Sequence, residues 1–378
     1  MQTVEGTNNL SVRRRNRQAV LRILYQNQTM TRKDIADRLG LSFPTVTQIL
    51  TELENEGLVQ TIGQQASTGG RRAFLNAIVT ESRAAVGVSV SMHWVELVLM
   101  NLSMTAVDTE EHQILFADTP EYWQTISSLV EGLLQRHEIP RQQMLGVGIS
   151  FPGVISTIGN TLEFAPTLGL EQMDLTKIPA HFRHPCYFGN DATLASRAEA
   201  WFRPELGKAA YLLLSRGVGG AFLSGRDNLF GSRACEFGHM VIQEDGKLCS
   251  CGRRGCLEAY CSSAVLVDSV DPEESETLES FFEQVERGEP KHVRIWQEYF
   301  SHLVTGIGNL RSIFDSDVII GGEMARCLKP YAEQLREELI RRSGLKEDGK
   351  YLRFCNYGKY DAAIGAALYH IDQFLSES

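Results

Sequence analysis

A histidine and three closely spaced cysteines constrain the fold of this chain more than any other feature of its sequence. Cys249, Cys251 and Cys256 follow the pattern Cys-x-Cys-x4-Cys, and His239 stands a short distance upstream. Three thiolates and one imidazole are the ligand set of a closed tetrahedral zinc site. Because four protein ligands leave no open position on the ion, we expect a structural zinc rather than a catalytic one. Such a site holds two segments of chain together wherever it forms.

Two other interpretations of these cysteines stay open, a redox-active thiol pair and a group of ordinary thiols. A disulfide framework is disfavoured, because we expect a cytoplasmic protein, in which thiols stay reduced. The basic run at 13–17 lacks the apolar core of a secretory signal, and no apolar stretch approaches the roughly 18 to 20 residues that cross a bilayer. The remaining cysteines are scattered and are expected to be small core residues: Cys186, Cys235, Cys261, Cys327 and Cys355.

The first 80 residues have the helix pattern of a helix-turn-helix domain. A helix is expected from residue 16, and a second begins at Thr31, a natural N-cap with an acidic residue three positions later. The second helix ends at Gly40, because glycine tolerates the left-handed conformation of a C-cap. After one further residue a third helix begins at the N-cap Ser42, and it ends near Gly57.

The third helix is the one that this architecture lays in the major groove of DNA. Its outward side carries hydroxyl and amide groups, which suit base edges and phosphates. Strands at 58–61 and 71–75, joined by a turn at 68–70, are expected to form a wing with two arginines at its tip, placed for phosphate or a minor groove. The predicted DNA contacts are Arg32, Ser42, Thr45, Thr47, Gln48, Arg71 and Arg72.

Charge is distributed unevenly between this head and the rest of the chain. Residues 1–83 carry eleven Lys or Arg and seven Asp or Glu, a net of +4, whereas the other 295 residues carry 26 and 40, a net of −14. A basic head on an acidic body favours a nucleic-acid partner for the head alone. The alternative is a three-helix protein-interaction module, but the caps, spacing, wing and charge all favour DNA binding.

From residue 84 strands and helices alternate, which predicts an α/β body whose length indicates two lobes. A hairpin is expected from strands at 84–90 and 94–102. The other expected elements are a helix at 121–137, a buried strand at 144–150, strands at 186–188, 210–214 and 318–320, and helices at 192–199 and 362–374.

Several short motifs follow one another along this body. They are Phe-Pro-Gly-Val at 151–154, Asn-Asp-Ala at 190–192, Glu-Phe-Gly-His at 236–239, the cysteine stretch, Ile-Gly-Gly at 320–322 and Ala-Ile-Gly-Ala-Ala at 363–367. In this order they resemble the ROK family of sugar kinases and sugar-responsive repressors, and the resemblance covers residues 15–375. The head, with Ser-Thr-Gly-Gly-Arg-Arg at 67–72, is similar to the repressor branch, of the xylose and N-acetylglucosamine repressor type.

The resemblance implies a two-lobed actin/hexokinase-like body of the ribonuclease H-like class, carrying the winged helix-turn-helix at its N-terminus. We expect the winged domain at 1–80 and a first lobe at 81–195, completed by the C-terminal helix at 360–378. The second lobe, which contains the zinc motif, is expected at 196–359.

The resemblance also implies a sugar site. The residue that matches the kinases' catalytic aspartate is Asp191, with Asn190 beside it, and Glu236, His239 and Glu258 are implied to contact the anomeric end of the sugar. Acids and amides suit a polyol, because each buried hydroxyl needs hydrogen-bond partners. The alternative for Asp191 is that it only caps the helix that follows it. Since His239 also belongs to the metal set, zinc would tie together two segments of the sugar site.

The phosphate-binding parts of a kinase are degenerate in this chain. The family's kinases begin with an Asp-x-Gly-x-Thr loop, whereas residues 87–94 read Gly-Val-Ser-Val-Ser-Met-His-Trp. Their second loop, Gly-Thr-Gly, is matched by Ser-Arg-Gly-Val-Gly-Gly at 215–220, with Arg216 in place of the threonine. Phosphoryl transfer depends on positioned phosphate and magnesium, so we expect no enzyme activity. Thr167 stands where many members have asparagine, which leaves the identity of the sugar open.

The sequence therefore predicts a sugar-responsive transcription regulator, a repressor of carbohydrate-use genes released by a monosaccharide or sugar phosphate. Two heads on a symmetric homodimer or homotetramer predict a palindromic operator, and no membrane partner is expected. Two alternatives stay open. One is an active ATP-dependent sugar kinase that carries a DNA-binding head, and the other is a repressor whose effector is a partner protein.

Overall fold

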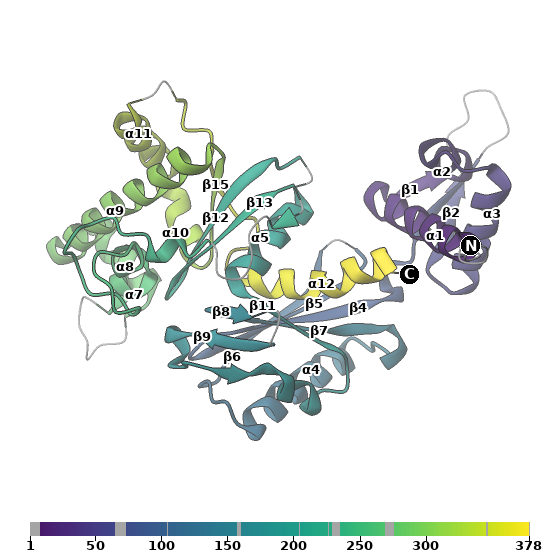
Figure 1. The fold of residues 1–378 in the computed structure, drawn as a ribbon, viewed down its shortest axis with the longest axis horizontal. Helices are drawn as coiled ribbons and strands as arrows, with labels where there is room; N and C mark the ends of the chain where they lie inside the picture. The colour runs from purple at the N-terminus through teal and green to yellow at the C-terminus, as the bar shows by residue number, and fades with distance from the viewer. Residues whose placement is uncertain are drawn as a thin grey trace, which may run out of the picture.

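The structure is a computed structural model of the 378-residue chain. It describes residues 8–64, 73–103, 105–156, 160–203, 205–225, 227–228, 235–268, 276–344 and 347–377. The chain forms a small N-terminal head and a larger body of two lobes, each built on its own five-stranded sheet (Figure 1). Within the described residues no helix has the length and apolar character needed to cross a membrane.

The head is a winged helix-turn-helix. Its elements are α1 (Asn8–Asn27), β1 (Thr29–Thr31), α2 (Arg32–Leu39), α3 (Phe43–Asn55), β2 (Val59–Gln64) and β3 (Phe74–Ile78), with the strands in the order β1-β3-β2. The predicted caps are confirmed: Thr31 Oγ1 accepts from the amide of Asp34 at 3.1 Å, and Gly40 has a φ of 63°. The amide of Thr45 donates to Ser42 Oγ at 3.3 Å, so α3 begins at its predicted cap. The described part of the predicted return strand begins at Phe74. The predicted turn at 68–70 and the two arginines after it lie outside the described residues.

The first lobe is a sheet in the order β11-β7-β4-β5-β6, with helices on both faces. Strands β4, β7 and β11 are parallel, whereas β4, β5 and β6 form an antiparallel meander. Helix α12 lies along one face and α4 along the other (Figure 1). The elements are β4 (Ala84–Val90), β5 (Trp94–Asn101), β6 (Ala106–Gln113), α4 (Pro120–Arg136), β7 (Met144–Phe151), β11 (Cys186–Asn190) and α12 (Asp361–Glu377).

The first lobe also carries a small sheet, in the order β10-β9-β8, and several single helical turns. These elements are β8 (Val154–Ser156), β9 (Thr161–Phe164), β10 (Met173–Asp174), η1 (Thr80–Ser82), η2 (Arg141–Gln143), η3 (Pro166–Leu168) and η4 (Leu175–His181).

The second lobe is a sheet in the order β14-β13-β12-β15-β16. Its strands are β12 (Lys208–Leu214), β13 (Val218–Ser224), β14 (Asp227–Asn228), β15 (Asp317–Gly321) and β16 (Leu352–Phe354). Its helices are η5 (Phe237–His239), α6 (Glu258–Cys261), α7 (Ser263–Val267), α8 (Leu278–Glu286), α9 (Pro290–Phe314), α10 (Met324–Leu328), η6 (Lys329–Tyr331), α11 (Ala332–Ser343) and η7 (Gly358–Tyr360).

Helix α5 (Asp191–Phe202) joins the two lobes. It packs against α12 of the first lobe with small side chains, among them Ala198 and Ala363, and against β13 of the second lobe. The division expected at residue 195 therefore falls inside this helix, and α12 packs on strands of the first-lobe sheet.

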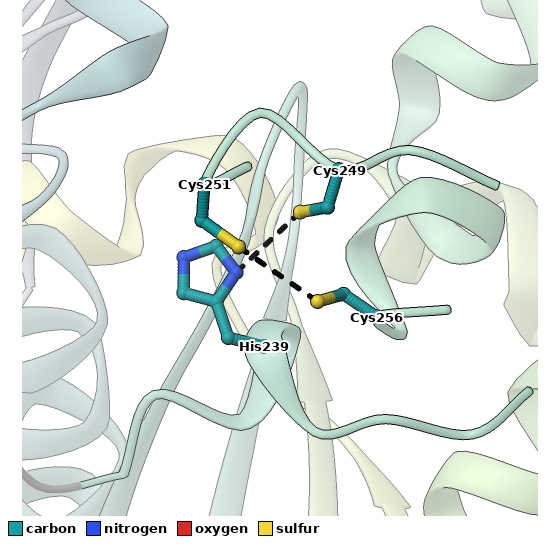
Figure 2. Close-up of side chains that lie close together, drawn as sticks. All are labelled: His239, Cys249, Cys251 and Cys256. Carbon is teal, nitrogen blue, oxygen red and sulfur yellow. Dashed lines mark hydrogen bonds between the residues drawn. The ribbon is translucent and has the colours of Figure 1, made fainter. Parts of the chain in front are cut away.

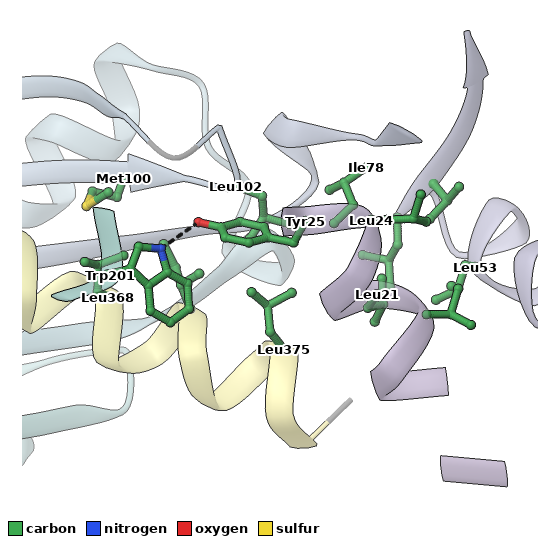
Figure 3. Packing of buried hydrophobic residues seen from close by; sticks show 14 of the residues in the cluster. Leu21, Leu24, Tyr25, Leu53, Ile78, Met100, Leu102, Trp201, Leu368 and Leu375 are labelled. Carbon is green, nitrogen blue, oxygen red and sulfur yellow. Dashed lines mark hydrogen bonds between the residues drawn. The ribbon is translucent and has the colours of Figure 1, made fainter. Parts of the chain in front are cut away.

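The head is docked on the body by a continuous hydrophobic core rather than by the linker alone. Buried side chains of α1 and α3 share one cluster with side chains of β5, α5 and α12. Figure 3 shows Tyr25 of the head pointing toward Trp201 of α5, with Leu375 of α12 close by. Because close-packed interiors transmit displacements, a movement of the body at this contact acts on the head.

Candidate functional site

The predicted metal ligands converge on one point. His239 Nδ1 and the sulfurs of Cys249, Cys251 and Cys256 all lie within 4.8 Å of one another. His239 ends the turn η5, and the cysteines lie on the loop that leads into α6 (Figure 2). This set holds three of the eight cysteines, and none of the eight forms a disulfide among the described residues. Of the five expected core cysteines, only Cys261 is fully buried, and the other four are half-buried.

The spacing of these atoms fits a tetrahedral ion. Cys251 Sγ lies 3.8 Å from Cys256 Sγ, and Cys249 Sγ lies 3.6 Å from His239 Nδ1. A tetrahedron with zinc–sulfur bonds of about 2.3 Å and a zinc–nitrogen bond of about 2.0 Å has edges of about 3.5 to 3.8 Å. The donor set and its geometry therefore suit a metal ion of the zinc class.

The cysteine loop is held by its own backbone. The amide of Cys249 donates to Arg253 O at 2.8 Å, and the amide of Gly255 donates to Lys247 O at 2.9 Å. Gly255 has a φ of 78°, and a Cβ there would stand 1.7 Å from Gln243 O, so only glycine fits this turn. These backbone hydrogen bonds hold the loop in a shape that brings its three sulfurs close together.

The thiols differ in their protonation. Burial raises the pKa of Cys249 to about 12 and also raises the pKa of Cys256. Burial would also raise the pKa of the Cys251 thiol, but hydrogen bonds from the backbone and guanidinium of Arg253 lower this pKa below its usual value. Cys251 therefore favours the thiolate form. A bound metal ion must displace the protons of Cys249 and Cys256.

Asn190 and Asp191 lie where β11 meets α5. Asn190 Oδ1 accepts from the amide of Thr193 at 2.9 Å, so Asn190 is the helix cap, which does not favour the alternative in which Asp191 only caps this helix. Asp191 Oδ1 instead accepts from the amide of Ala192 at 2.7 Å. Burial raises the pKa of Asp191 to about 7, although this amide acts against the shift, and the nearby charge of Glu236 adds to it. A half-buried carboxyl of this kind suits a ligand hydroxyl as its partner.

The other predicted sugar residues come from the second lobe and lie beside the first pair. Burial raises the pKa of Glu236, the charge of His239 lowers it, and the charge of Glu258 raises it, so these three side chains interact electrostatically. Glu258 Oε1 accepts from Ser250 Oγ at 2.7 Å, which ties the carboxylate to the cysteine loop. Electrostatic interactions thus link the predicted sugar residues of the first lobe with those of the second.

One residue of this junction was not selected from the sequence as a site residue. Thr167, on η3 of the first lobe, has a buried hydroxyl that finds no hydrogen-bond partner among the described residues. A Cβ at Gly217 would stand 3.2 Å from both Thr167 Cγ2 and Glu258 Oε2, so Thr167 faces the predicted sugar residues across the lobes. The sequence indicates this residue by one feature, which is that threonine follows Pro166 where many members of the family have asparagine. A buried hydroxyl without a partner is costly, and a bound polar ligand would satisfy it.

The first phosphate loop of the kinases is replaced by a closed hairpin turn. The amide of Ser91 donates to Trp94 O at 2.9 Å, and the amide of Trp94 donates to Ser91 Oγ at 3.2 Å. Gly87 serves packing, because a Cβ there would stand 1.7 Å from Ala363 O of α12. These amides are therefore occupied by the protein itself.

The second loop, at 215–220, is also occupied. The amide of Ser215 donates to Gly217 O at 3.0 Å, and the amide of Val218 donates to Glu258 Oε2 at 3.0 Å. The guanidinium of Arg216 pairs with Asp268 at 2.9 Å. The groups that would cradle a phosphate here already have partners.

On the head, the predicted DNA contacts of α3 differ in their placement. Ser42 and Gln48 are exposed and Thr45 is half-exposed, but the hydroxyl oxygen of Thr47 is buried, which does not suit contact with a base edge. Phe43, which was not selected from the sequence, is 54% exposed in the first turn of α3. An exposed aromatic ring on this helix suits contact with a thymine methyl group.

Arginines of α1 and α2 neutralise the acidic second half of α3. Arg13 pairs with Glu52, Arg17 donates to Glu56 Oε1 at 2.8 Å, and Arg32 lies 3.7 Å from Glu54. Gln48 Nε2 also donates to Glu52 Oε1, at 3.1 Å. The role of Arg32 at DNA stays a prediction, since this side chain already has an acidic partner, and Arg71 and Arg72 lie outside the described residues.

Comparison with known families agrees with this geometry. A model of the ROK family matches residues 85–373, which is most of the chain. The chain belongs to the ROK family. A second model, described as winged helix-turn-helix DNA-binding, matches residues 13–60.

Two curated relatives carry repressor names. This chain is 27% identical to the xylose repressor of Caldicellulosiruptor bescii over 351 residues, which cover 87% of this chain and 88% of the relative. It is 28% identical to the N-acetylglucosamine repressor of Escherichia coli O6:H1 over 267 residues, which cover 68% of this chain and 65% of the relative. The two names give different sugars.

Two solved structures show the same fold. A ROK family transcriptional regulator, a homologue of the Escherichia coli MLC protein, has a TM-score of 0.75 and 19% identity, and the match covers 97% of each chain. A ROK family glucokinase from Streptomyces griseus in complex with glucose and AMPPNP has a TM-score of 0.62 and 22% identity, covering 76% of this chain and 98% of that one. The kinase matches the body, and the regulator matches the head as well.

Proposed function

We propose that this ROK protein is a sugar-responsive transcriptional repressor. The winged head binds operator DNA, and a monosaccharide or sugar phosphate bound at the junction of the lobes weakens that binding. Because DNA-binding heads of this type read half-sites in pairs, the repressor acts as a homodimer or homotetramer on a palindromic operator.

The observation that carries this proposal is the docking of a winged helix-turn-helix on a body that gathers polar side chains at its lobe junction. Asp191 belongs to the first lobe, whereas Glu236 and Glu258 belong to the second, so a ligand held by all three bridges the lobes. A ligand of this kind favours one relative position of the lobes over the other. The names of the repressor relatives support the same function.

The body is proposed to bind its sugar without phosphorylating it. Both loops that match the phosphate cradles of the kinases have their amides hydrogen-bonded within the protein, at Ser91 and at Val218. A nucleotide would have to break these bonds before it could be positioned, and positioning is nearly all of the catalysis in phosphoryl transfer.

The Cys/His cluster is proposed to hold a structural zinc ion. His239 is three residues from Glu236, and Glu258 lies two residues beyond Cys256, so the ion would fix two segments that carry sugar residues. Its role is positional, because three sulfurs and one nitrogen complete its coordination and leave no place for a reacting group.

A thermal-shift screen against monosaccharides and their phosphates tests the effector. A ligand that binds only the native state raises the melting temperature, by an amount that grows with its concentration. Operator DNA selected in vitro with the wild-type protein then allows the second step, in which fluorescence anisotropy measures operator affinity with and without the stabilising sugar. A sugar that stabilises the protein and leaves operator affinity unchanged contradicts the proposal.

An ATP-dependent sugar kinase is the rival function, and the glucokinase neighbour is the observation that favours it. A coupled assay of ADP release over the same sugars separates the two. Sugar-dependent turnover that Asp191→Ala abolishes would establish the kinase. Calorimetry that detects no binding of any pentose, hexose or amino sugar would instead favour a protein effector.

A further inference from the structure

The last turn of α5 contacts the head and both lobes at once. On one side Trp201, which is 8% exposed, reaches α1 of the head. On another side Glu199 and Arg203 reach the segment that follows β16 in the second lobe. The helix itself packs along α12 of the first lobe. The head, the first lobe and the second lobe therefore all contact this turn.

The contact with the head is specific. The indole N–H of Trp201 donates to the hydroxyl of Tyr25 at 3.3 Å, as the dashed line in Figure 3 shows. The two rings meet edge to face, with centroids 5.7 Å apart and planes at 65°. Tyr25 is 4% exposed, so this pair is buried within the core that joins head and body. Removing either group removes a buried hydrogen bond between the head and the body.

The contact with the second lobe is polar and buried. The carboxylate of Glu199, which is fully buried, accepts from the amide of Asn356 at 2.6 Å. The guanidinium of Arg203 donates to Phe354 O at 3.0 Å and to Asn356 Oδ1 at 2.8 Å. Since Phe354 ends β16, any displacement of the second-lobe sheet acts directly on the last turn of α5.

The first turn of α5 carries the predicted sugar residues. Asp191 is its first residue, and the cap Asn190 donates from Nδ2 to Gly153 O at 2.8 Å, which fixes this end to the first lobe. Twelve helical residues span about 18 Å at 1.5 Å per residue. One helix thus runs from the proposed effector site to the contact with the DNA-binding head.

We propose that α5 transmits the state of the sugar site to the DNA-binding head, with the Trp201–Tyr25 contact as the link. This inference rests on the proposed function. A sugar that draws the second lobe toward Asp191 also moves the segment at Asn356, and Glu199 and Arg203 carry that movement into the last turn of α5. Trp201 then shifts against Tyr25, and the head changes its position on the body. Tyr25 and Trp201 are positioning residues, and neither contacts the sugar or the DNA.

Tyr25→Phe in the full-length protein tests the link. It keeps the ring and the packing but removes the acceptor of the indole N–H. The measured quantity is the coupling factor, the ratio of operator Kd with and without saturating sugar, with D-xylose, N-acetyl-D-glucosamine and D-glucose as probes. A factor of about 5 to 150 is expected in the wild type, and a factor near one in Tyr25→Phe. The sugar Kd and the operator Kd without sugar are expected to stay close to the wild-type values.

Tyr122→Phe is the matched control, because it removes a buried tyrosine hydroxyl on α4 that has no hydrogen-bond partner among the described residues. Its coupling factor should equal that of the wild type. Trp201→Phe approaches the same link from the other side and should lower the factor as Tyr25→Phe does. If both variants keep the wild-type factor while their operator affinity is normal, the link is wrong and the repressor function stands. If no probe changes operator affinity in the wild type, the proposed function fails, and the link fails with it.

Discussion

The amide of Val218 donates a hydrogen bond to Glu258 Oε2 at 3.0 Å, so a carboxylate of the predicted sugar site occupies an amide of the second phosphate loop. The other oxygen of the same carboxylate accepts from Ser250 Oγ at 2.7 Å, within the cysteine loop. One side chain therefore connects the loop that matches the kinases' second phosphate loop, the predicted sugar site and the Cys/His cluster. A charged acceptor with two donors is held more firmly than a neutral one, because charge-assisted hydrogen bonds are about twice as strong.

Glu258→Gln should weaken sugar binding by about tenfold or more while the metal stays bound. The substitution exchanges one acceptor oxygen for an NH2 group, so Val218 and Ser250 can no longer both donate to it, and a hydrogen bond to a charged group contributes about 1.5 to 3 kcal/mol. Thermal-shift titration gives the affinity, and atomic absorption gives the metal content. Glu244→Gln, at an exposed position of the neighbouring segment, is the control. An unchanged sugar affinity in Glu258→Gln would show that this carboxylate does not serve the sugar.

Cys251→Ser should lose both the metal and the sugar response, while the head still binds DNA. Serine is a poor ligand for zinc, and without the ion His239 and the cysteine loop lose the constraint that places Glu236 and Glu258. The head has its own buried residues on α1, α2 and α3, so operator binding without sugar should persist. Zinc content, sugar-induced thermal shift and anisotropy with operator DNA check these three outcomes. Cys327→Ser, outside the cluster, should match the wild type in all of them.

The local parts of this structure could be predicted because their causes lie within one turn of the chain. Thr31 and Asp34 cap α2 from three residues apart, and Gly40 ends it by its own conformation. The metal ligands likewise lie close in sequence, and their chemistry leaves few arrangements. The sugar residues depended on the family resemblance, since nothing in their spacing brings Asp191 to Glu236 across the lobes.

The missed features depend on contacts between distant segments. Tyr25 and Trp201 are separated by 176 residues, and neither carries a local signal of their contact. The sequence relates Gly87 only to a phosphate loop. In the structure glycine is needed at this position because a Cβ there would collide with Ala363 O of α12. The buried hydroxyl of Thr167 acquires its meaning only when Gly217 and Glu258 are placed beside it. Packing of this kind depends on the volumes and shapes of all the core side chains together, so no short stretch of sequence predicts it.

Asp191→Asn should flatten the pH dependence of stability. Burial raises the pKa of Asp191 from 3.8 to about 7. At pH values between these two, the carboxyl is therefore protonated in the folded state and ionised in the unfolded state. Stability therefore falls as pH rises through this window and is constant above it. The variant removes this contribution, and urea unfolding across the window measures the slope. Glu96 and Asp361, whose pKa values burial also raises to about 7, leave a remaining slope of the same sign. A slope identical to that of the wild type would contradict the shifted pKa.

Sugar affinity should depend on the same group. A sugar hydroxyl that donates to Asp191 requires the ionised carboxylate, whose pKa lies at about 7 before the sugar binds. The affinity is then expected to fall about tenfold for each pH unit below that value and to level off above it. Calorimetry over this range measures the profile. An affinity independent of pH would show that the carboxyl binds the sugar equally well when protonated.

Arg71→Ala combined with Arg72→Ala should weaken operator binding and reduce its salt dependence. Both arginines belong to the predicted wing tip, which lies outside the described residues, and each phosphate contact that is lost lowers the slope of log K against log salt by about 0.9. Anisotropy titrations at several salt concentrations give this slope. Lys177→Ala with Arg183→Ala removes two exposed charges from the body and should leave the slope unchanged. Because the loss at the wing is electrostatic, it should be similar for operator and unrelated DNA, and a loss confined to the operator would instead indicate that the wing reads bases.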